Sequence, residues 1–213
     1  GSEVSDRTQE RLQGIVTSAA KDSQLGAFFA SYMDEAALDQ LDAAPLKADL
    51  ARVDAIASKA EFSRFMAGTQ GDFGATLFGL GVIPDPNNPA LNTLFLITSG
   101  LGLPDRDYYL LDKHKAERDA YRAYVERTLA MVDTPNAAAA AGAILAFETE
   151  IPKISWDKND LRDIGKLNNP MTLAQLTSYA PGLDWATYLA DAKITSVPST
   201  MLVADNTAIK ALA

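Results

Sequence analysis

Hydrophobic residues along this chain recur mostly every three or four positions, the spacing that places them on one side of an α-helix. Asp34 precedes one such stretch as a capping residue would, and Pro45 opens the next, where a first-turn proline is favourable. The pattern predicts helices over residues 4–21, 24–33, 35–41, 45–56, 62–66, 113–132 and 137–151, followed by two that begin near residues 172 and 185.

Short capping motifs mark where three of the later helices start. Thr172, with Gln175 three residues on, forms a capping box, and Asp184 stands directly before the helix that begins at Trp185. Thr134 followed by a proline is typical of a cap and a first-turn residue, so we expect it to open the helix over 137–151.

The period changes to two in one stretch only. Over residues 76–83, large side chains alternate with Gly79 and Gly81, which predicts a strand with one crowded face and one nearly bare face. Residues 85–89 are rich in turn formers, and residues 91–98 predict the returning strand. A bare strand face also invites close approach by another backbone, either a helix or an extended peptide.

Together these elements predict a mainly α fold, a multi-helix domain with one inserted β-hairpin and more than half of its residues in helices. No repeat of 20–50 residues and no Ser/Gly linker divides the chain, so we expect a single domain over residues 1–213. The start at Gly1-Ser2, without a methionine, is interpreted as the mark of trimming, processing or a tag.

The amino-acid composition argues against several classes of function. The chain has 213 residues, no cysteine and a net charge of −9, with no basic cluster, which argues against disulfides, thiol chemistry and a nucleic-acid partner. Its apolar stretches are far shorter than the roughly 18 residues that cross a bilayer, so no membrane span is expected.

The chain has only one histidine, His114. Zinc hydrolase sites generally use two or three histidines, and a Ser-His-Asp triad would have to be built on this same ring. Charged residues surround it over 113–117, so we expect it to be exposed. We therefore expect neither catalytic nor metal-binding residues in this chain.

Several acidic and aromatic residues could carry chemistry but have simpler structural interpretations. Asp157, Asp160 and Asp163 suggest a calcium site, but their spacing by threes among basic residues favours a helix surface with local ion pairs. Glu148 is interpreted as the polar edge of a helix, and the stripe that contains Tyr121 as helix core.

The densest pattern follows the predicted hairpin. Its glycines permit positive φ, its proline fixes the chain, Asp105 can cap a short helical turn, and two adjacent tyrosines add large area with polar tips. We expect a rigid anchor in which Arg106 or Asp107 forms an ion pair and a tyrosine packs on a helix. A competing hypothesis is that these residues line a peptide-binding chamber. The predicted signature residues are Gly102, Leu103, Pro104, Arg106, Asp107, Tyr108 and Tyr109.

This run, LGLPDRDYYL over residues 101–110, resembles the signature of the neprilysin family of zinc metallo-endopeptidases, especially its bacterial members. Other landmarks resemble the family in the same order: FFASYMDE at 28–35, APLK at 44–47, the Arg162-Asp163 pair, and NPMTLAQL at 169–176. One departure is Leu167, which precedes Asn168 where relatives often have a tyrosine.

The resemblance implies that this chain is the early, non-catalytic lid lobe of a larger peptidase. Zinc would then belong to a catalytic domain outside this chain, the partners would be that domain and peptide substrates, and the location would be the periplasm, the cell envelope or the exterior, although cytosolic relatives exist. An arginine that meets substrate in relatives has no counterpart near Ser5, so that role is not transferred. The alternative is a stand-alone helical protein-interaction module.

Overall fold

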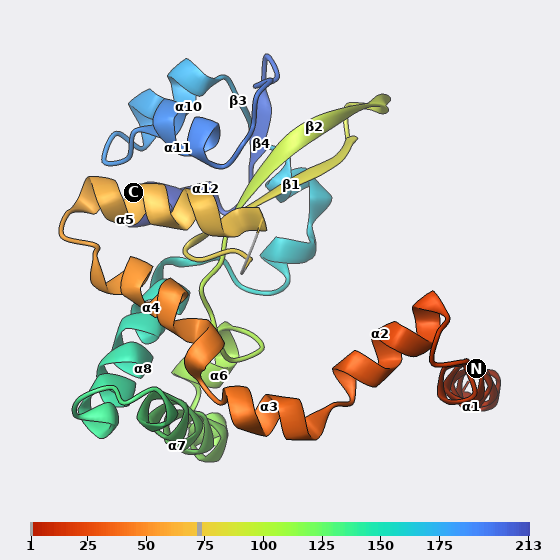
Figure 1. Ribbon diagram of the computed structural model, residues 1–213. Coiled ribbons are helices and arrows are strands. Elements are labelled where there is room, and N and C mark those ends of the chain that lie inside the picture. Colours follow the sequence, from red (N-terminus) through yellow and green to blue (C-terminus); the bar gives the residue numbers. More distant parts are fainter. Residues whose placement is uncertain (1, 72–73) are drawn as a thin grey trace. The chain divides into compact units, whose positions relative to one another are not determined.

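The computed structural model describes residues 2–71 and 74–213 (Figure 1). The chain divides into two compact units, residues 1–51 (unit 1) and residues 52–213 (unit 2). About 60% of the residues are helical, which confirms the predicted mainly α class. In the part of the chain that the structure describes, no helix is long and apolar enough to cross a membrane.

Unit 1 is a succession of helices. Ser23 caps the second helix, and the predicted cap Asp34 is confirmed, because its Oδ1 accepts a hydrogen bond from the backbone N–H of Ala37 at 3.0 Å. Pro45 lies in a short 3-10 turn just before the next helix. The elements are α1 (Ser2–Thr17), α2 (Gln24–Tyr32), α3 (Glu35–Leu41) and η1 (Ala44–Leu46), and α4 (Lys47–Asp54) crosses the boundary between the units.

The apolar side chains of unit 1 are largely exposed. Among its described residues, only Gly26 is buried. Large residues on the predicted stripes, such as Leu12, Ile15 and Phe28, are more than half exposed. The described residues of unit 1 therefore form no cluster of buried apolar side chains, and packing within the unit stabilises its helices little.

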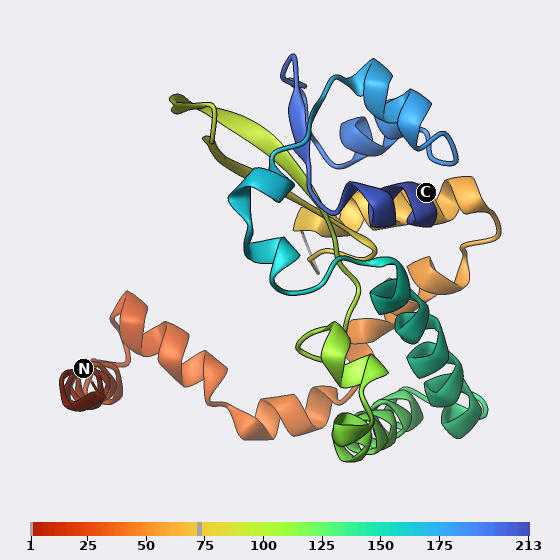
Figure 2. The ribbon, with the colours of Figure 1, turned by 180° about the vertical axis from the view of Figure 1, so that it is seen from behind.

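Unit 2 contains a core, and all the strands of the described residues lie in it. Its helices are α5 (Lys59–Gly68), α6 (Arg106–Leu110), α7 (Lys115–Met131), α8 (Ala137–Ile154), α9 (Ile164–Leu167), α10 (Leu173–Tyr179), α11 (Trp185–Asp191) and α12 (Asn206–Leu212), with 3-10 turns η2 (Thr69–Gly71), η3 (Asp112–His114) and η4 (Asp160–Arg162). Its strands are β1 (Phe78–Asp85), β2 (Asn88–Thr98), β3 (Pro170–Met171) and β4 (Met201–Val203). Helices α7 and α8 run side by side as a pair (Figure 2).

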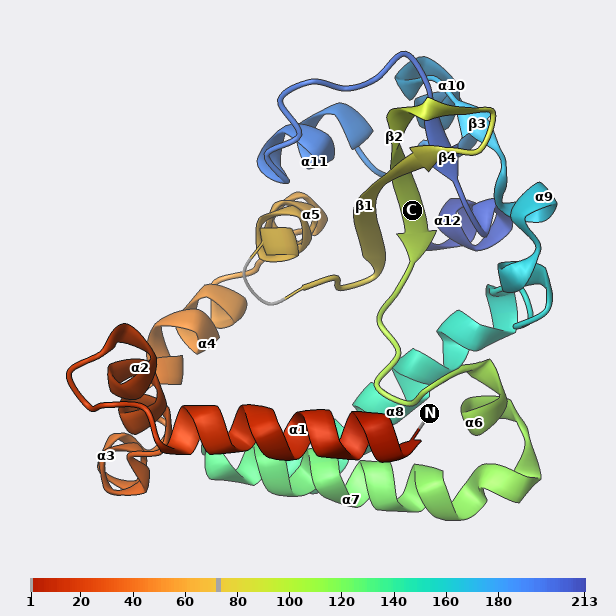
Figure 3. The same ribbon diagram turned by 90° about the vertical axis from the view of Figure 1, so that its right-hand side faces the viewer.

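The predicted hairpin is confirmed, and it is part of a larger sheet. Strands β1 and β2 pair antiparallel, with Phe78 opposite Thr98 and Val82 opposite Leu94. The sheet order is β1-β2-β4-β3, with β4 parallel to β2 and antiparallel to β3 (Figure 3). The sequence does not reveal β3 and β4, because strands of two and three residues are too short to show alternation, and all three residues of β4 are buried.

The crowded face of the hairpin packs into the core at Phe78 and Leu80, whereas Val82 on the same face is largely exposed. The Phe78 ring lies edge-on to Trp185 and Tyr188, with ring centroids 5.3 and 5.9 Å away. The indole N–H of Trp185 donates to the Ala180 carbonyl at 2.8 Å, so that this buried polar group is satisfied. Helices α10, α11 and α12 thus cover one face of the sheet through residues far apart in the sequence.

Two of the three predicted cap motifs are confirmed and one is wrong. Thr172 forms a complete capping box with Gln175, and Asp184 caps α11. Thr134 does not open α8, because its backbone N–H bonds back to the Leu129 carbonyl and so closes the end of α7. Asn136 precedes α8 instead, at φ 53°, a left-handed conformation that asparagine tolerates.

Candidate functional site

A tight turn leads from β2 into α6 and carries the signature residues. Gly100 adopts φ +91°, the left-handed region that favours glycine. Asp105 is the N-cap of α6, and its Oδ1 accepts from the backbone N–H of Asp107 at 2.8 Å. The glycine and the cap therefore act as the sequence predicts, and together they fix where α6 begins.

Tyr109 joins this turn to the helix pair. Its ring is buried, and its hydroxyl accepts hydrogen bonds from the backbone N–H groups of Gly102 and Leu103 at 3.0 and 2.9 Å. The same hydroxyl donates to Glu148 Oε2 on α8 at 2.7 Å. Tyr121 on α7 donates to the other oxygen, Oε1, at 2.8 Å. One carboxylate therefore connects the turn, α7 and α8.

The two tyrosine hydroxyls are held in the protonated form. Burial raises the pKa of Tyr109 and of Tyr121, and the hydrogen bond to the Glu148 carboxylate raises both further. Both phenols therefore keep their protons, and remain hydrogen-bond donors, at pH values where a free tyrosine begins to ionise.

Gly102 is required by its contact with this network. A Cβ atom at this position would lie 2.0 Å from the Tyr121 hydroxyl oxygen. That oxygen is held in place by Glu148, so it cannot move away without breaking a charge-assisted hydrogen bond. The close approach of backbone to helix thus explains this glycine without any need for positive φ.

Tyr108 packs beside the turn, on His114. The two rings stack with centroids 4.1 Å apart, and the histidine side chain is 17% exposed, so the prediction that His114 is exposed is wrong. The charged neighbours do point outward, but the short α6 brings an aromatic ring over the imidazole. Arg118 holds the backbone of α6 in position, because its Nη1 donates to the carbonyls of Tyr108 and Leu111 at 2.8 and 2.7 Å.

The ion pair of the turn forms through Asp107. Its Oδ2 lies 2.9 Å from Lys158 Nζ, and this hydrogen bond lowers the pKa of Asp107 and raises the pKa of Lys158. The pair joins α6 to the segment that follows α8, 51 positions along the chain.

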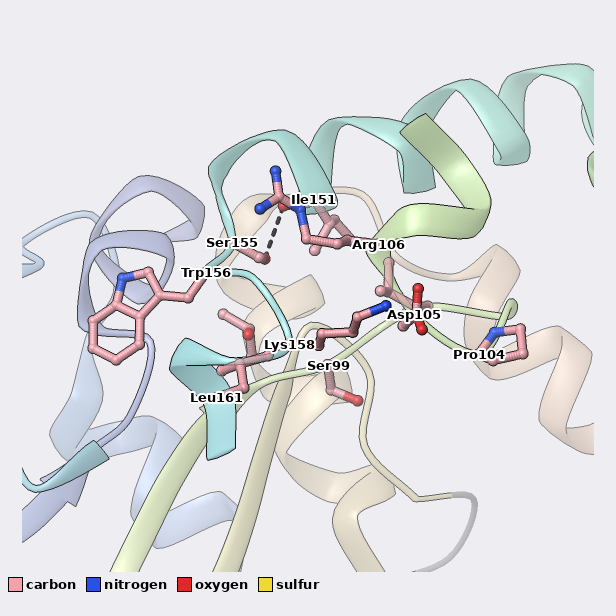
Figure 4. A pocket seen from close by; sticks show the side chains of 11 residues that line it. Ser99, Pro104, Asp105, Arg106, Ile151, Ser155, Trp156, Lys158 and Leu161 are labelled. Atoms are coloured by element: carbon pink, nitrogen blue, oxygen red, sulfur yellow. Dashed lines mark hydrogen bonds between the residues drawn. The ribbon is translucent and has the colours of Figure 1, made fainter. Parts of the chain in front are cut away.

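Arg106, the neighbouring signature residue, points into a small pocket (Figure 4). Its Nε atom is buried and has no hydrogen-bond partner among the described residues. In Figure 4 the Lys158 amino group points toward Asp105 across the same pocket. The pocket has a volume of about 150 Å³ and is lined by Thr98, Ser99, Leu101, Pro104, Asp105, Arg106, Ile151, Ser155, Trp156, Lys158 and Leu161.

Behind the pocket lies a fully buried carboxylate, Asp205, at φ 48°. Its Oδ2 accepts from Thr98 Oγ1 at 3.0 Å, and its Oδ1 accepts from the backbone N–H of Trp156 at 3.2 Å. Burial raises the pKa of Asp205, and these hydrogen bonds oppose the rise. Asp205 thereby fastens the end of β2 and the end of α8 to the start of α12.

The structure places Glu148 and the helix of Tyr121 differently from the sequence-based prediction, and the sequence does not indicate the role of Asp205. Glu148 is predicted as a polar helix edge, yet it shares the spacing of Ala141, Ile144 and Ile151, a signal that it lies on the inner face. The stripe of Tyr121 is predicted as core, but Tyr124 on that helix is 57% exposed. Nothing local marks Asp205.

The predicted acidic cluster acts as a set of local caps. Asp157 Oδ1 accepts from the backbone N–H groups of Asn159 and Asp160, and Asp163 caps α9. Asp160 pairs with Lys166. These carboxylates lie in turns around η4 rather than along a helix surface, which corrects the expected placement. One oxygen of each carboxylate takes part in a local cap or ion pair.

A catalytic zinc does not fit the residues of this chain. Within residues 2–71 and 74–213, no three His, Cys, Asp or Glu side chains are grouped so that they could hold a metal ion. His114 stacks on Tyr108, and its Nδ1 lies 3.3 Å from Glu117. No zinc chemistry is therefore assigned to these residues.

The sequence of this chain is similar to the sequences of endothelin-converting enzymes. Human endothelin-converting enzyme-like 1 is 26% identical over 204 residues, which cover 85% of this chain and 26% of that protein. Guinea pig endothelin-converting enzyme 1 is 31% identical over 119 residues, which cover 53% of this chain and 15% of that protein. The chain thus spans about a quarter or less of these relatives' own length.

Solved structures match nearly the whole chain. The zinc metalloprotease Zmp1 of Mycobacterium tuberculosis, in complex with an inhibitor, superposes with a TM-score of 0.85 at 25% identity, over 97% of this chain and 33% of that one. PepO of Lactobacillus rhamnosis superposes with a TM-score of 0.78 at 18% identity, over 99% of this chain and 35% of that one, a likeness of fold alone. The family model described as Peptidase family M13 matches residues 1–213. The chain therefore belongs to peptidase family M13 and corresponds to the N-terminal portion of its members.

Proposed function

We propose that this chain is the non-catalytic lid lobe of a larger zinc metallo-endopeptidase that acts on peptides. The observation that carries the proposal is the extent of the match with the family and with its solved members. The family model extends over all 213 residues, while the chain spans only about a third of the solved relatives. A region of this size, whose described residues form no metal-binding group, would contribute to such an enzyme by enclosing the substrate rather than by reacting with it.

The catalytic domain and its zinc would lie outside this chain and would be its main partner. The zinc metalloprotease Zmp1 has been solved in an open state as well as with an inhibitor. A lobe that opens and closes must be internally rigid so that its motion is transmitted as a whole. The matched solved proteins above come from bacteria, and we extend the proposal to a periplasmic or cell-envelope location.

Within this lobe, the turn from β2 into α6 that carries signature residues 102–109 (the signature turn) serves as a rigid corner. The support is the Tyr109–Glu148–Tyr121 network, the contact at Gly102 and the Asp107–Lys158 pair, which tie one short turn to three later segments. Leu103 donates its backbone N–H to the network, and Pro104 restricts the chain just before α6. These contacts favour an anchoring role for the turn over direct contact with peptide.

The first experiment is to read the encoding gene beyond Ala213 and to express its whole product. A His-Glu-x-x-His motif downstream and zinc-dependent cleavage of a short internally quenched peptide are the expected results. This chain alone should neither bind zinc stoichiometrically nor cleave that peptide. If the gene ends near Ala213, the stand-alone interaction module is the correct description.

The lid role needs a second measurement on the whole enzyme. After any cysteines outside these 213 residues are replaced, a single cysteine can be introduced at exposed Met131 and labelled with a fluorescent donor. An acceptor on a zinc-chelating peptide inhibitor should then show energy transfer that increases when the enzyme closes, and the enzyme should spare a folded protein of equal charge. Equal cleavage of folded and short substrates would contradict the lid role even in an active enzyme.

A further inference from the structure

Strand β1 is the outermost strand of the sheet, and its outward edge is only partly occupied. Gln70 covers the first part: its Nε2 donates to the Phe78 carbonyl at 2.7 Å, and its Oε1 accepts from the Leu80 N–H at 3.3 Å. One side-chain amide thus makes the pair of hydrogen bonds that a neighbouring strand would make. The contact also shows that residues 78 and 80 turn their backbone groups away from β2.

The same alternation continues along the strand beyond Gln70. In an antiparallel pair, residues two apart direct their backbone groups to the same side, so the N–H and C=O of Val82 point outward as those of Leu80 do. Among the described residues, the Leu80 carbonyl and both backbone groups of Val82 have no partner, and the Val82 side chain is 68% exposed. Pro84, the next outward residue, has no N–H, so the open edge is short.

A pocket with a single charge lies beside this open edge. It has a volume of about 420 Å³, and its apolar lining includes Val82 and Leu94, which face each other across the hairpin. Among the described residues, Lys193 is the only charged side chain in the lining, and it is exposed and makes no ion pair there. The complete lining is Val82, Asn92, Thr93, Leu94, Lys193, Ile194, Thr195, Ser196 and Pro198.

We propose that the free edge of β1 at Leu80 and Val82 binds an extended peptide in trans, with one carboxylate of that peptide meeting Lys193. The strand edge supplies two acceptors and one donor for the peptide backbone, the mode by which extended peptides add to a sheet. Side chains of an added strand alternate between its two faces, so one of them is directed to the side on which the pocket lies.

The charges favour this occupant over others. The chain carries a net charge of −9, which repels a strongly acidic partner in general, but Lys193 offers one local cation for one carboxylate. The polar lining of Asn92, Thr195 and Ser196 suits a wet, reversible contact, whereas a permanently covered edge would be lined by apolar residues. Binding of this kind does not require that the parent enzyme cleave the bound peptide.

The test is an NMR titration of the ¹⁵N-labelled 213-residue chain. The probes are an acetylated hexapeptide of alternating threonine and valine with a free C-terminal carboxylate, its C-terminal amide, and an amide in which one threonine is replaced by glutamate. We expect amide shifts at residues 80–82 and 193–196 and roughly two- to fivefold weakening on amidation, the range for a pair with an exposed lysine. If the glutamate peptide restores binding, a side-chain carboxylate suffices; if it does not, the C-terminal carboxylate is the group bound.

Variants separate the backbone contact from the charge. Val82→Pro removes the outward N–H and should weaken every probe roughly fivefold or more, while Val82→Thr keeps it and should bind like the wild type. Lys193→Gln should abolish the difference between carboxylate and amide, and Lys153→Gln, at an exposed lysine outside the pocket, should preserve it.

Three results would overturn the proposal. The first is the absence of shifts at residues 80–82 at millimolar peptide. The second is unchanged binding by both Val82→Pro, in a variant whose spectrum shows a folded core, and Lys193→Gln. The third is concentration-dependent dimerisation through β1 that the peptide does not compete with, which would make a second copy the occupant.

Discussion

At the scale of single residues, the chain relies on a few buried or partly buried polar groups whose partners are distant in sequence. Glu148 accepts from two tyrosine hydroxyls, and Asp205 accepts from Thr98 and from the backbone of Trp156. A buried acceptor that loses its donors, or a donor that loses its acceptor, costs more than the hydrogen bond contributed. Stability should therefore be concentrated at these positions.

The Glu148 network gives a prediction with an internal control. Glu148→Ala leaves two tyrosine hydroxyls without their acceptor and should lower the free energy of unfolding by about 2–3 kcal/mol. Glu150→Ala, two residues along the same helix, removes only an exposed pair with Lys153 and should change it by less than about 0.5 kcal/mol. Urea unfolding of both variants checks this, and equal effects would show that the network is not a centre of stability.

Asp205 makes stability depend on pH in a stated direction. Because burial raises its pKa in the folded state above the ordinary value of 3.8, the folded state holds this proton more tightly than the unfolded state. The stability associated with protonated Asp205 is therefore fully present at pH below 3.8. It is lost as the pH rises through the higher pKa of Asp205 in the folded state. Asp205→Asn lacks this dependence.

The measurement compares the wild type with Asp205→Asn in urea across about pH 3 to 7. The unfolding free energy of the wild type relative to the variant should increase as the pH falls, since protonation relieves the buried charge. A difference that stays constant with pH, or that moves the other way, would mean that Asp205 is ionised without penalty.

At the scale of elements, the signature turn depends on how closely it approaches α7. Gly102→Ala forces a Cβ atom against the Tyr121 hydroxyl and should destabilise the chain by about 1–3 kcal/mol, the usual cost of overpacking. Gly142→Ala on α8 is the matched control, because a Cβ atom added there would have no neighbour within 4 Å and alanine favours a helix. It should leave stability equal or raise it by up to about 1 kcal/mol.

Thermal unfolding of the two alanine variants tests this contact. A lower melting temperature for Gly102→Ala together with an equal or higher one for Gly142→Ala is expected. If Gly102→Ala melts like the wild type, the turn moves away from α7 without cost and cannot be the rigid corner of the lobe.

At the scale of the whole molecule, the two units differ in how they are stabilised. Unit 2 encloses an aromatic core, whereas among the described residues of unit 1 only Gly26 is buried. Short helices without packing are marginal in water. In the isolated chain we expect amides of residues 2–41 to exchange with solvent near their intrinsic rates, and those of β2 and α11 to exchange many times more slowly.

Hydrogen exchange followed by mass spectrometry measures this difference directly. In the whole gene product, residues 2–41 should gain protection if a further domain covers them, while α11 should change little. Strong protection of residues 2–41 in the isolated chain would show that unit 1 is stable by itself and that its exposed apolar faces need no partner.

The sequence by itself determined the features that depend on neighbours along the chain. The alternation of Phe78, Leu80 and Val82 with glycines specified the hairpin, and side-chain chemistry placed the caps at Asp34 and Thr172, because strand period and capping each involve only a few consecutive residues. The tertiary structure decided what distant segments share. It added β4 to the sheet, enclosed Asp205, and turned Glu148 from a helix edge into the link between two tyrosines. The spacing of Glu148 along its helix indicates its inward position, but hydrogen bonds across 27 to 107 positions leave no local pattern. They form only when packing excludes water from groups that the sequence keeps apart.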